Sequence, residues 1–142
     1  MATGRRKGIA EKGDRLTLRI AAKDKFALEL LAQKEGLTLS TLVMKSLERP
    51  LREGLTVSKK QGKRTVKIYI PDAAFDPLTP DRLVNLALVA PELLTDREKV
   101  IWKVIKENPA FMHENSPDFK SIRLRWESIQ TEADELLDKH SG

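Results

Sequence analysis

The sequence contains no cysteine, so disulfide bonds, zinc ribbons and thiol catalysis are all excluded. Aromatic residues make up only 5% of the chain, which is too few for the stacking platforms that bind single-stranded nucleic acids. No apolar run approaches the roughly 20 residues that span a bilayer, and residues 1–13 lack the apolar stretch of a signal peptide. These absences lead us to expect a cytoplasmic protein that uses no cofactor.

Motifs of the common enzyme classes are also missing. The chain has no Gly-rich phosphate loop, no nucleophile elbow and no zinc-protease motif. His113 and His140 are far apart in the sequence and have no metal-ligand spacing around them. The carboxylates of Glu132, Asp134 and Glu135 fall on a helix that we expect to be mainly solvated. We therefore expect neither enzymatic activity nor a metal site.

The charge that is present is divided unevenly along the chain. Residues 1–70 hold 17 Lys and Arg against 7 Asp and Glu, a net charge of +10, whereas residues 71–142 hold 9 against 14, a net charge of −5. The basic half can neutralise phosphates and release their counterions. The acidic half would be repelled by DNA, so we expect it to pack, dimerise or meet another protein. A merely solvated, lopsided surface is the alternative.

Residues 15–20 alternate strictly between polar and apolar side chains, which is the period of a strand with one buried face. The apolar face holds Leu16, Leu18 and Ile20. The polar face holds Arg15, Thr17 and Arg19. A strand this short is not stable alone, so it needs a partner strand and a covering helix.

Two helices are expected directly after this strand. Residues 23–35 have helical periodicity, and Gly36 is placed to stop that helix. A second helix is expected to begin with Thr38 as its N-cap and to finish by Gly54. The apolar face of the first helix holds Phe26, Ala27, Leu30 and Leu31. The apolar face of the second helix holds Leu39, Leu42, Val43 and Leu47.

This order of strand, helix, tight turn and helix resembles the ribbon-helix-helix family, the DNA-binding family of Arc, MetJ and CopG. The resemblance covers Arg15 to about Arg52. It is carried by Arg15-Leu-Thr-Leu-Arg-Ile20, by the helix through Phe26 and Leu30, and by Gly36-Leu-Thr-Leu-Ser-Thr-Leu-Val43. The alternative is an α+β fragment whose arginines only solvate an exposed strand face.

The resemblance implies a two-stranded antiparallel ribbon that enters the major groove. In that family the outward strand residues touch base edges, which here implies Arg15, Thr17 and Arg19. The family also anchors a phosphate at the start of the second helix, which implies the amides near Leu39 and Ser40 with the hydroxyls of Ser40 or Thr41. The chemistry agrees, since Arg can bond guanine, Thr can bond a base, and a helix N-terminus attracts anions.

A second alternating stretch, residues 65–70, leaves the pairing of the ribbon open. Residues 55–64 are expected to be a basic linker, and residues 65–108 then resemble a degenerate second unit. In a tandem single chain, 15–20 pairs with 65–70, and the reading face gains Thr65, Lys67 and Tyr69. In a homodimer, 15–20 pairs with its copy in another chain, and 65–70 is an extra strand.

Three further helices are expected in the acidic half. They cover residues 81–90, residues 95–108 with a capping box from Thr95 and Glu98, and residues 118–140. The last has a short heptad-like seam, which indicates either packing within its own domain or a docking surface for another protein. Trp102 and Trp126 lie near these apolar stripes and are expected in the core. The seam residues are Phe119, Ile122, Trp126, Ile129, Ala133 and Leu136.

We therefore expect an α+β, mainly α protein: a ribbon-helix-helix module, as an intermolecular dimer or a tandem pseudo-dimer, followed by C-terminal helices. The expected parts are a basic arm at 1–13, the module at 14–54, the linker at 55–64, the second unit at 65–108 and a final helix at 109–142. The arm either lies on DNA or is a solubilising tail, and its cations are Arg5, Arg6 and Lys7.

The expected function is sequence-specific binding of double-stranded DNA, as a transcriptional repressor, an autoregulator or an accessory factor of a plasmid or other mobile element. The alternative is a protein-interaction module, in which the acidic C-terminal half binds a partner such as a toxin, a relaxase or a partition ATPase.

Overall fold

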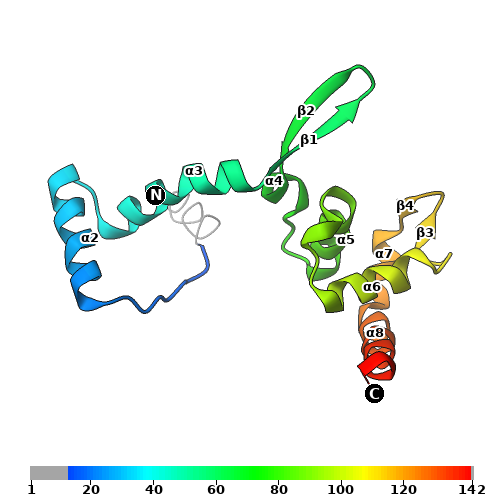
Figure 1. Cartoon of the computed structure of the whole chain (residues 1–142). Coiled ribbons are helices and arrows are strands. Elements are labelled where there is room, and N and C mark those ends of the chain that lie inside the picture. The colour runs from blue at the N-terminus through cyan, green and yellow to red at the C-terminus, as the bar shows by residue number, and fades with distance from the viewer. Residues whose placement is uncertain (1–12, 142) are drawn as a thin grey trace, which may run out of the picture. The chain divides into compact units, whose positions relative to one another are not determined.

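The computed structural model describes residues 13–141, which divide into two compact units, Met1–Glu48 and Arg49–Gly142 (Figure 1). The chain is mainly helical, with two small antiparallel sheets of two strands each. This composition confirms the α+β, mainly α class. The arm residues Arg5, Arg6 and Lys7 lie outside the described residues.

The first unit holds helix α2 (Ala22–Glu35) and most of α3 (Leu39–Gly54), and the sequence signals at the turn between them are confirmed. Gly36 ends α2 in the left-handed conformation with φ +69°, which a residue without Cβ adopts freely. The Thr41 amide donates to Oγ1 of Thr38 at 3.1 Å, so Thr38 caps α3 as expected.

Residues 15–20, expected as a strand, have no regular secondary structure in the single chain. A strand exists through hydrogen bonds to a neighbour, and no neighbouring strand is paired with this segment in the described chain. Within the described part of the first unit only Ala32 and Leu42 are buried hydrophobic residues, whereas Leu16 is 79% exposed and Leu18 66%. The first unit therefore has almost no core of its own.

The second unit begins with a β-hairpin of β1 (Thr56–Gln61) and β2 (Arg64–Tyr69), joined by Gly62 and Lys63. Gly62 has φ +66° at the first central position, the pattern of a type II′ turn. Hence the expectation of a linker at 55–64 is wrong. The tandem pairing of 65–70 with 15–20 is also wrong, because the partner of β2 is β1.

A short helix that the sequence analysis missed follows directly, α4 (Ile70–Ala74). Pro71 directly follows the alternating stretch 65–70 and occupies the first turn of this helix, where its missing N–H costs nothing. Helix α5 (Thr79–Val89) and helix α6 (Asp96–Lys106) appear where expected, separated by a 3₁₀ turn, η1 (Pro91–Leu93). Both hydrogen bonds of the expected capping box at the start of α6 are present.

The single helix expected at 118–140 is wrong, because two helices occupy this region: α7 (Phe119–Leu124) and α8 (Trp126–Ser141). The break falls at Arg125, whose backbone leaves helical geometry at φ −109° and ψ 19°. A small hairpin of β3 (Met112–His113) and β4 (Ser116–Pro117) precedes them. Its two turn residues both have positive φ, as a type I′ turn requires.

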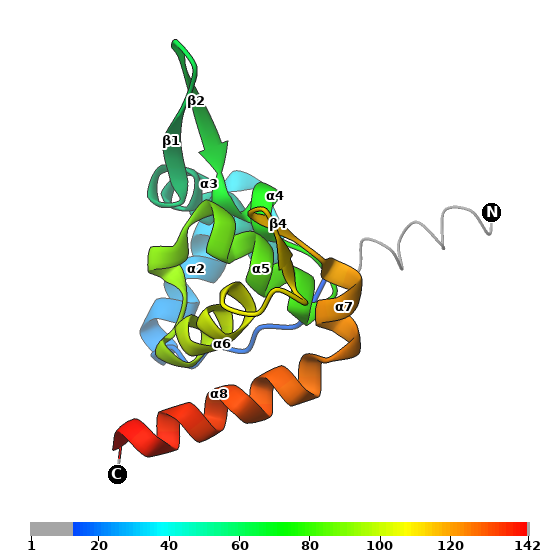
Figure 2. The same ribbon diagram turned by 90° about the vertical axis from the view of Figure 1, so that its right-hand side faces the viewer.

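One apolar core joins α5, α6, α7 and α8 of the second unit, and α6 packs on α8 (Figure 2). The core expectation for Trp102 is confirmed, since it is buried, and Trp126 packs half-buried beside it. The twelve buried core residues are Leu83, Val84, Ala87, Leu94, Ile101, Trp102, Val104, Ile105, Phe111, Ile122, Ile129 and Ala133. Because seam residues of α7 and α8 are among them, the reading of that seam as packing within its own domain is confirmed.

Two ion pairs tie these helices together at the edge of the core. Asp81, only 7% exposed, accepts two hydrogen bonds from Arg123, from Nε at 2.9 Å and from Nη2 at 2.7 Å. Arg97 of α6 donates to both carboxylate oxygens of Asp134 on α8, at 2.8 and 3.2 Å. In the range that the structure describes, no helix is long and apolar enough to cross a membrane.

Candidate nucleic-acid interface

The first candidate surface is the polar side of residues 15–20. Arg15, Thr17 and Arg19 are all exposed. Within residues 13–141, none of these three side chains forms an ion pair or a hydrogen bond. Their charges and hydroxyl are thus available to a ligand, and their contact with base edges stays a prediction.

The apolar side of the same segment belongs to a larger exposed set. Eight large hydrophobic side chains of the first unit are exposed: Leu16, Leu18, Ile20, Phe26, Leu30, Leu31, Met44 and Leu47. We call these eight residues the unburied apolar set. Scattered exposed hydrophobic residues are normal, but so many in so short a segment form an unusually large exposed apolar surface. The set includes every apolar residue of the 15–20 alternation.

The start of α3 is the second candidate surface. Leu39 and Ser40 are the first two helical residues, so their amides point out of the helix without an intrahelical acceptor. The Thr41 amide, by contrast, is used by Thr38, whose hydroxyl also donates to Thr41 Oγ1 at 2.8 Å. Of the three residues expected to hold a phosphate, Leu39 and Ser40 therefore keep their donors available, and Thr41 is already engaged by the cap.

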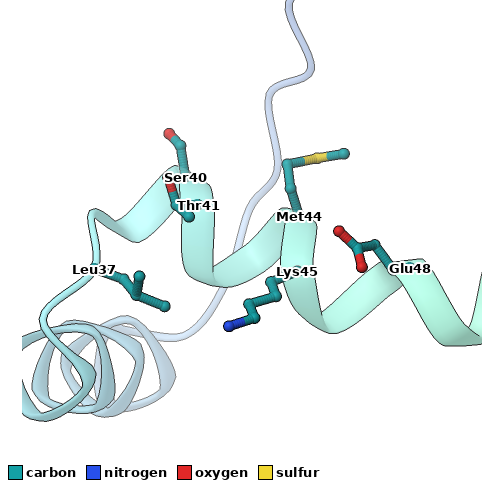
Figure 3. A pocket seen from close by; sticks show the side chains of 6 residues that line it. All are labelled: Leu37, Ser40, Thr41, Met44, Lys45 and Glu48. Carbon is teal, nitrogen blue, oxygen red and sulfur yellow. The ribbon is translucent and has the colours of Figure 1, made fainter.

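A shallow groove runs along α3 beside this helix start (Figure 3). The groove is lined by Leu37, Ser40, Thr41, Met44, Lys45 and Glu48. Lys45 lies one turn beyond Ser40 and adds positive charge near the helix N-terminus, whereas Glu48 lies a further turn away. An anion would consequently be favoured at the Ser40 end of this groove rather than at its Glu48 end.

The third candidate surface is the β1–β2 hairpin, whose register sorts its side chains onto two faces. Residues directly opposite each other in an antiparallel pair share a face. The expected candidates Thr65, Lys67 and Tyr69 therefore lie together, opposite three residues that the sequence analysis missed. We call this the outer face; its six residues are Thr56, Ser58, Lys60, Thr65, Lys67 and Tyr69.

The opposite, inner face of the hairpin is attached to the second unit. Val57 packs against a small core of Ile70, Ala74 and Ala90. Lys59, also on this face, donates from Nζ to the Leu88 carbonyl at 3.3 Å. These contacts hold the base of the hairpin, so its outer face and tip are the parts that remain exposed.

Tyr69 is held at the base of the outer face and is half-buried there. The guanidinium carbon of Arg52 lies 4.5 Å from the centroid of its ring. A cation–π contact of this kind covers one of the two faces of the ring. Tyr69 consequently anchors the hairpin, and the ligand-binding potential of the outer face lies in its hydroxyls and lysines.

The hairpin carries many cations. Residues 55–70 contain five Lys and Arg and no Asp or Glu. Each cation of the two strands lies opposite a neutral residue, and Lys63 lies in the turn. The pairs are Lys60 with Thr65, Lys67 with Ser58, Arg64 with Gln61 and Lys59 with Val66. No cation is directly opposite another, which avoids the repulsion that like charges cause across strands.

The shifted pKa values of the second unit have structural causes. The Ser121 amide and hydroxyl both donate to Asp118, the N-cap of α7, and lower the pKa of that carboxyl; His113, 3.5 Å away, adds to the effect. Hydrogen bonds from Arg97 likewise lower the pKa of Asp134. Among the described residues no group of three or more His, Asp and Glu is arranged to hold a metal ion.

The outer-face residues on β1 were missed for a definite reason. Ser58, Lys59 and Lys60 lack the polar–apolar alternation that marks a strand, so they read as a linker. A usable signal was nevertheless present, because Gly62-Lys63 between two short runs fits the two-residue hairpin turn that begins with glycine.

Comparison with known proteins adds no family to this description. No protein-family model, no curated protein and no solved structure matches the chain. The resemblance to ribbon-helix-helix proteins therefore rests on residues 15–52 alone and stays a prediction, and the function is argued from the surfaces described above.

Proposed function

We propose that the chain is a sequence-specific duplex-DNA-binding protein that reads the major groove with a ribbon formed by residues 15–20 of two copies. The observation that carries this proposal is the unburied apolar set. Seven of its eight residues, all but Met44, belong to the apolar faces expected of the strand and the two helices, and a single chain leaves all seven exposed.

A second copy is the partner that fits this surface. It brings an identical strand, and two such strands paired antiparallel satisfy each other's backbone groups. Their apolar sides then meet the helices, and each large apolar side chain that becomes fully buried contributes about 1.5–3 kcal/mol. The tandem alternative has no second strand to offer, because β2 is paired with β1.

The polar side of the same ribbon supplies the DNA chemistry. Pairing leaves Arg15, Thr17 and Arg19 of both copies on the face away from the helices. A two-stranded ribbon fits the major groove, where Arg can bond guanine O6 and N7 and Thr can contact a base or a thymine methyl. The Leu39 and Ser40 amides at the start of α3 would hold a backbone phosphate and set the register on the duplex.

The biological role that suits such a dimer is repression or autoregulation of transcription, or an accessory function on a plasmid or other mobile element. A twofold-symmetric reader binds two related half-sites, so its target is expected to be palindromic or nearly so.

Selection of bound duplexes from a random pool tests this function. Wild type is expected to enrich one palindromic motif, and Arg15→Ala/Arg19→Ala to lose it, because each bidentate Arg–guanine contact discriminates by about 1–3 kcal/mol. Lys23→Ala/Lys25→Ala removes the same charge from exposed positions of α2 and should keep the motif. Enrichment of the same motif by the arginine variant would contradict base reading by the ribbon.

The alternative of a protein-interaction module loses the docking surface expected for it. That surface was the heptad-like seam of residues 118–140, and Ile122, Ile129 and Ala133 of this seam are buried in the core of the second unit. The DNA-binding proposal is the one that the exposed surfaces favour.

A further inference from the structure

We propose that the β1–β2 hairpin is a second duplex-DNA contact, separate from the ribbon, whose tip and outer face hold backbone phosphates without reading bases. The inference rests on the proposed function only for the identity of the polymer, because the hairpin argument uses residues of the second unit alone.

Positive charge in this region is concentrated in the hairpin. Residues 55–70 carry five cations and no anion, whereas residues 71–142 carry a net charge of −5. A general solubility role would not require such segregation. A polyanion approaching the second unit is repelled by its helices and attracted by the hairpin, so the hairpin is where a phosphate backbone would be bound.

The cations of the tip and outer face are also without anionic partners. In the described range, Lys60, Lys63, Arg64 and Lys67 form no ion pair, although arginines elsewhere in the unit are paired with carboxylates. Glu53 and Asp72, the nearest carboxylates along the chain, lie beyond both ends of 55–70. The favourable interaction that these cations lack within the chain is the interaction that phosphates supply.

The geometry of the outer face suits a phosphate chain. Ser58 and Lys60 on β1 lie opposite Lys67 and Thr65 on β2, so hydroxyls and ammonium groups alternate along the face and across it. Neighbours on one face of a strand are about 6.5 Å apart, since each residue advances roughly 3.3 Å. Hydroxyl and lysine side chains are common donors to phosphate oxygens. Figures 1 and 2 both show the hairpin extending away from the helices of its unit.

The same surface is poorly suited to other polyanions. Residues 58–65 contain no apolar side chain, so the tip has nothing to insert into a lipid bilayer. Tyr69 is the single aromatic residue of the outer face, it is half-buried, and Arg52 covers one face of its ring, so the outer face has no row of aromatic side chains to stack successive bases of a single strand. A duplex, which presents mainly its phosphates, remains the polymer that fits.

The test compares the salt dependence of duplex binding by full-length proteins. Lys60→Gln/Lys63→Gln/Arg64→Gln/Lys67→Gln is expected to flatten the slope of log affinity against log salt by roughly 0.9 for each phosphate that is no longer neutralised, about 3 to 4 in total. Affinity at about 0.1 M salt should fall by more than tenfold on both random and selected duplexes. The selected motif should not change.

Two matched controls separate the hairpin from overall charge. The first removes four exposed lysines of the helical part, Lys99, Lys103, Lys120 and Lys139, and is expected to leave the slope nearly unchanged. The second compares two single variants on one strand. Lys60→Gln on the outer face should weaken binding more than Lys59→Gln, whose ammonium is directed at the Leu88 carbonyl. Tryptophan fluorescence verifies that each variant keeps the folded second unit.

The possible results separate this inference from the proposed function. A quadruple hairpin variant with the same slope as the lysine control overturns the inference, and so does an effect limited to single-stranded DNA. If wild type selects no motif while the hairpin variant still loses salt-dependent duplex binding, the proposed function fails and the inference stands. If both proteins select one motif with equal slopes, the function stands and the inference fails.

Discussion

The two units of the chain differ in how they use their apolar residues. The second unit places twelve hydrophobic residues in one core and leaves Ile105 and Ile122 fully buried. The described part of the first unit buries only Ala32 and Leu42 among its hydrophobic residues and exposes eight large ones. Helix α3 of the first unit is amphipathic like α5, α6 and α8 of the second unit, whereas α2 has apolar residues on more than one side. The units therefore differ in what their apolar residues pack against.

This difference separates self-sufficient folding from folding by association. The second unit satisfies its helices internally, with caps such as Thr95 and bridges such as Asp81–Arg123. In the proposed dimer the first unit would bury its apolar set against a second copy, and its stability would then be linked to protein concentration. The comparison predicts two unfolding transitions, of which only one depends on concentration.

The largest effect is expected from Leu18→Asp, which would place a carboxylate in the interface of the proposed dimer. Burying an unpaired charge is so unfavourable that dimerisation, and DNA binding with it, should be lost. Analytical ultracentrifugation of the full chain measures the outcome. Thr17→Asp introduces the same carboxylate one residue away, on the polar side of the alternation, and should leave the dimer intact. Equal dimerisation of both variants would remove the basis of the comparison.

A smaller and separable effect is expected from Ile105→Ala in the core of the second unit. Ile105 is fully buried, and truncation of a buried isoleucine to alanine costs about 2–5 kcal/mol. Trp102 and Trp126 both belong to this core, so tryptophan fluorescence follows its unfolding alone. The fluorescence transition should shift at every protein concentration, whereas the mass measured by ultracentrifugation should stay that of a dimer. Dissociation of this variant would show that the units are not independent.

The smallest effect concerns the acid sensitivity of the second unit. The pKa of Asp118 is lowered in the folded protein, chiefly by the Ser121 amide. Its contribution to stability is therefore present above the unfolded pKa and is lost as pH falls through the lower, folded value. Asp118→Asn can still accept from Ser121 but no longer titrates, so its fluorescence-monitored unfolding midpoint should fall less on acidification than that of wild type. Asp138→Asn, exposed on α8, should behave like wild type.

Local signals in the sequence were sufficient where a helix end depends on one side chain. Gly36, Thr38 and the capping box of Thr95 were read from residue type and spacing, and the hydrogen bonds that they imply are present. The packing of the α7–α8 seam within its own unit was likewise one of the two expected readings. These features are local or strongly periodic, which is why sequence alone indicates them.

The errors occurred where the outcome depends on a partner distant from the residue itself. Residues 65–70 had the correct strand pattern, but their partner is a lysine-rich segment with no strand pattern of its own. Helix α4 follows the hairpin directly, and its first residue is held by a bond to a distant part of the chain, from the Ile70 amide to the Leu55 carbonyl. The break at Arg125 has no sequence signal that we recognise. The base contacts of Arg15, Thr17 and Arg19 stay predictions.

The register of the β1–β2 hairpin also has a kinetic consequence. Since each strand cation faces a neutral residue, the hairpin can be strongly basic and still folded before any ligand arrives. A preformed element loses little conformational entropy on association, whereas a basic tail of the same charge must become ordered each time it binds. In the proposed complex the hairpin would therefore associate at a rate set by diffusion and electrostatic steering, and long-range attraction would shorten the search for a duplex.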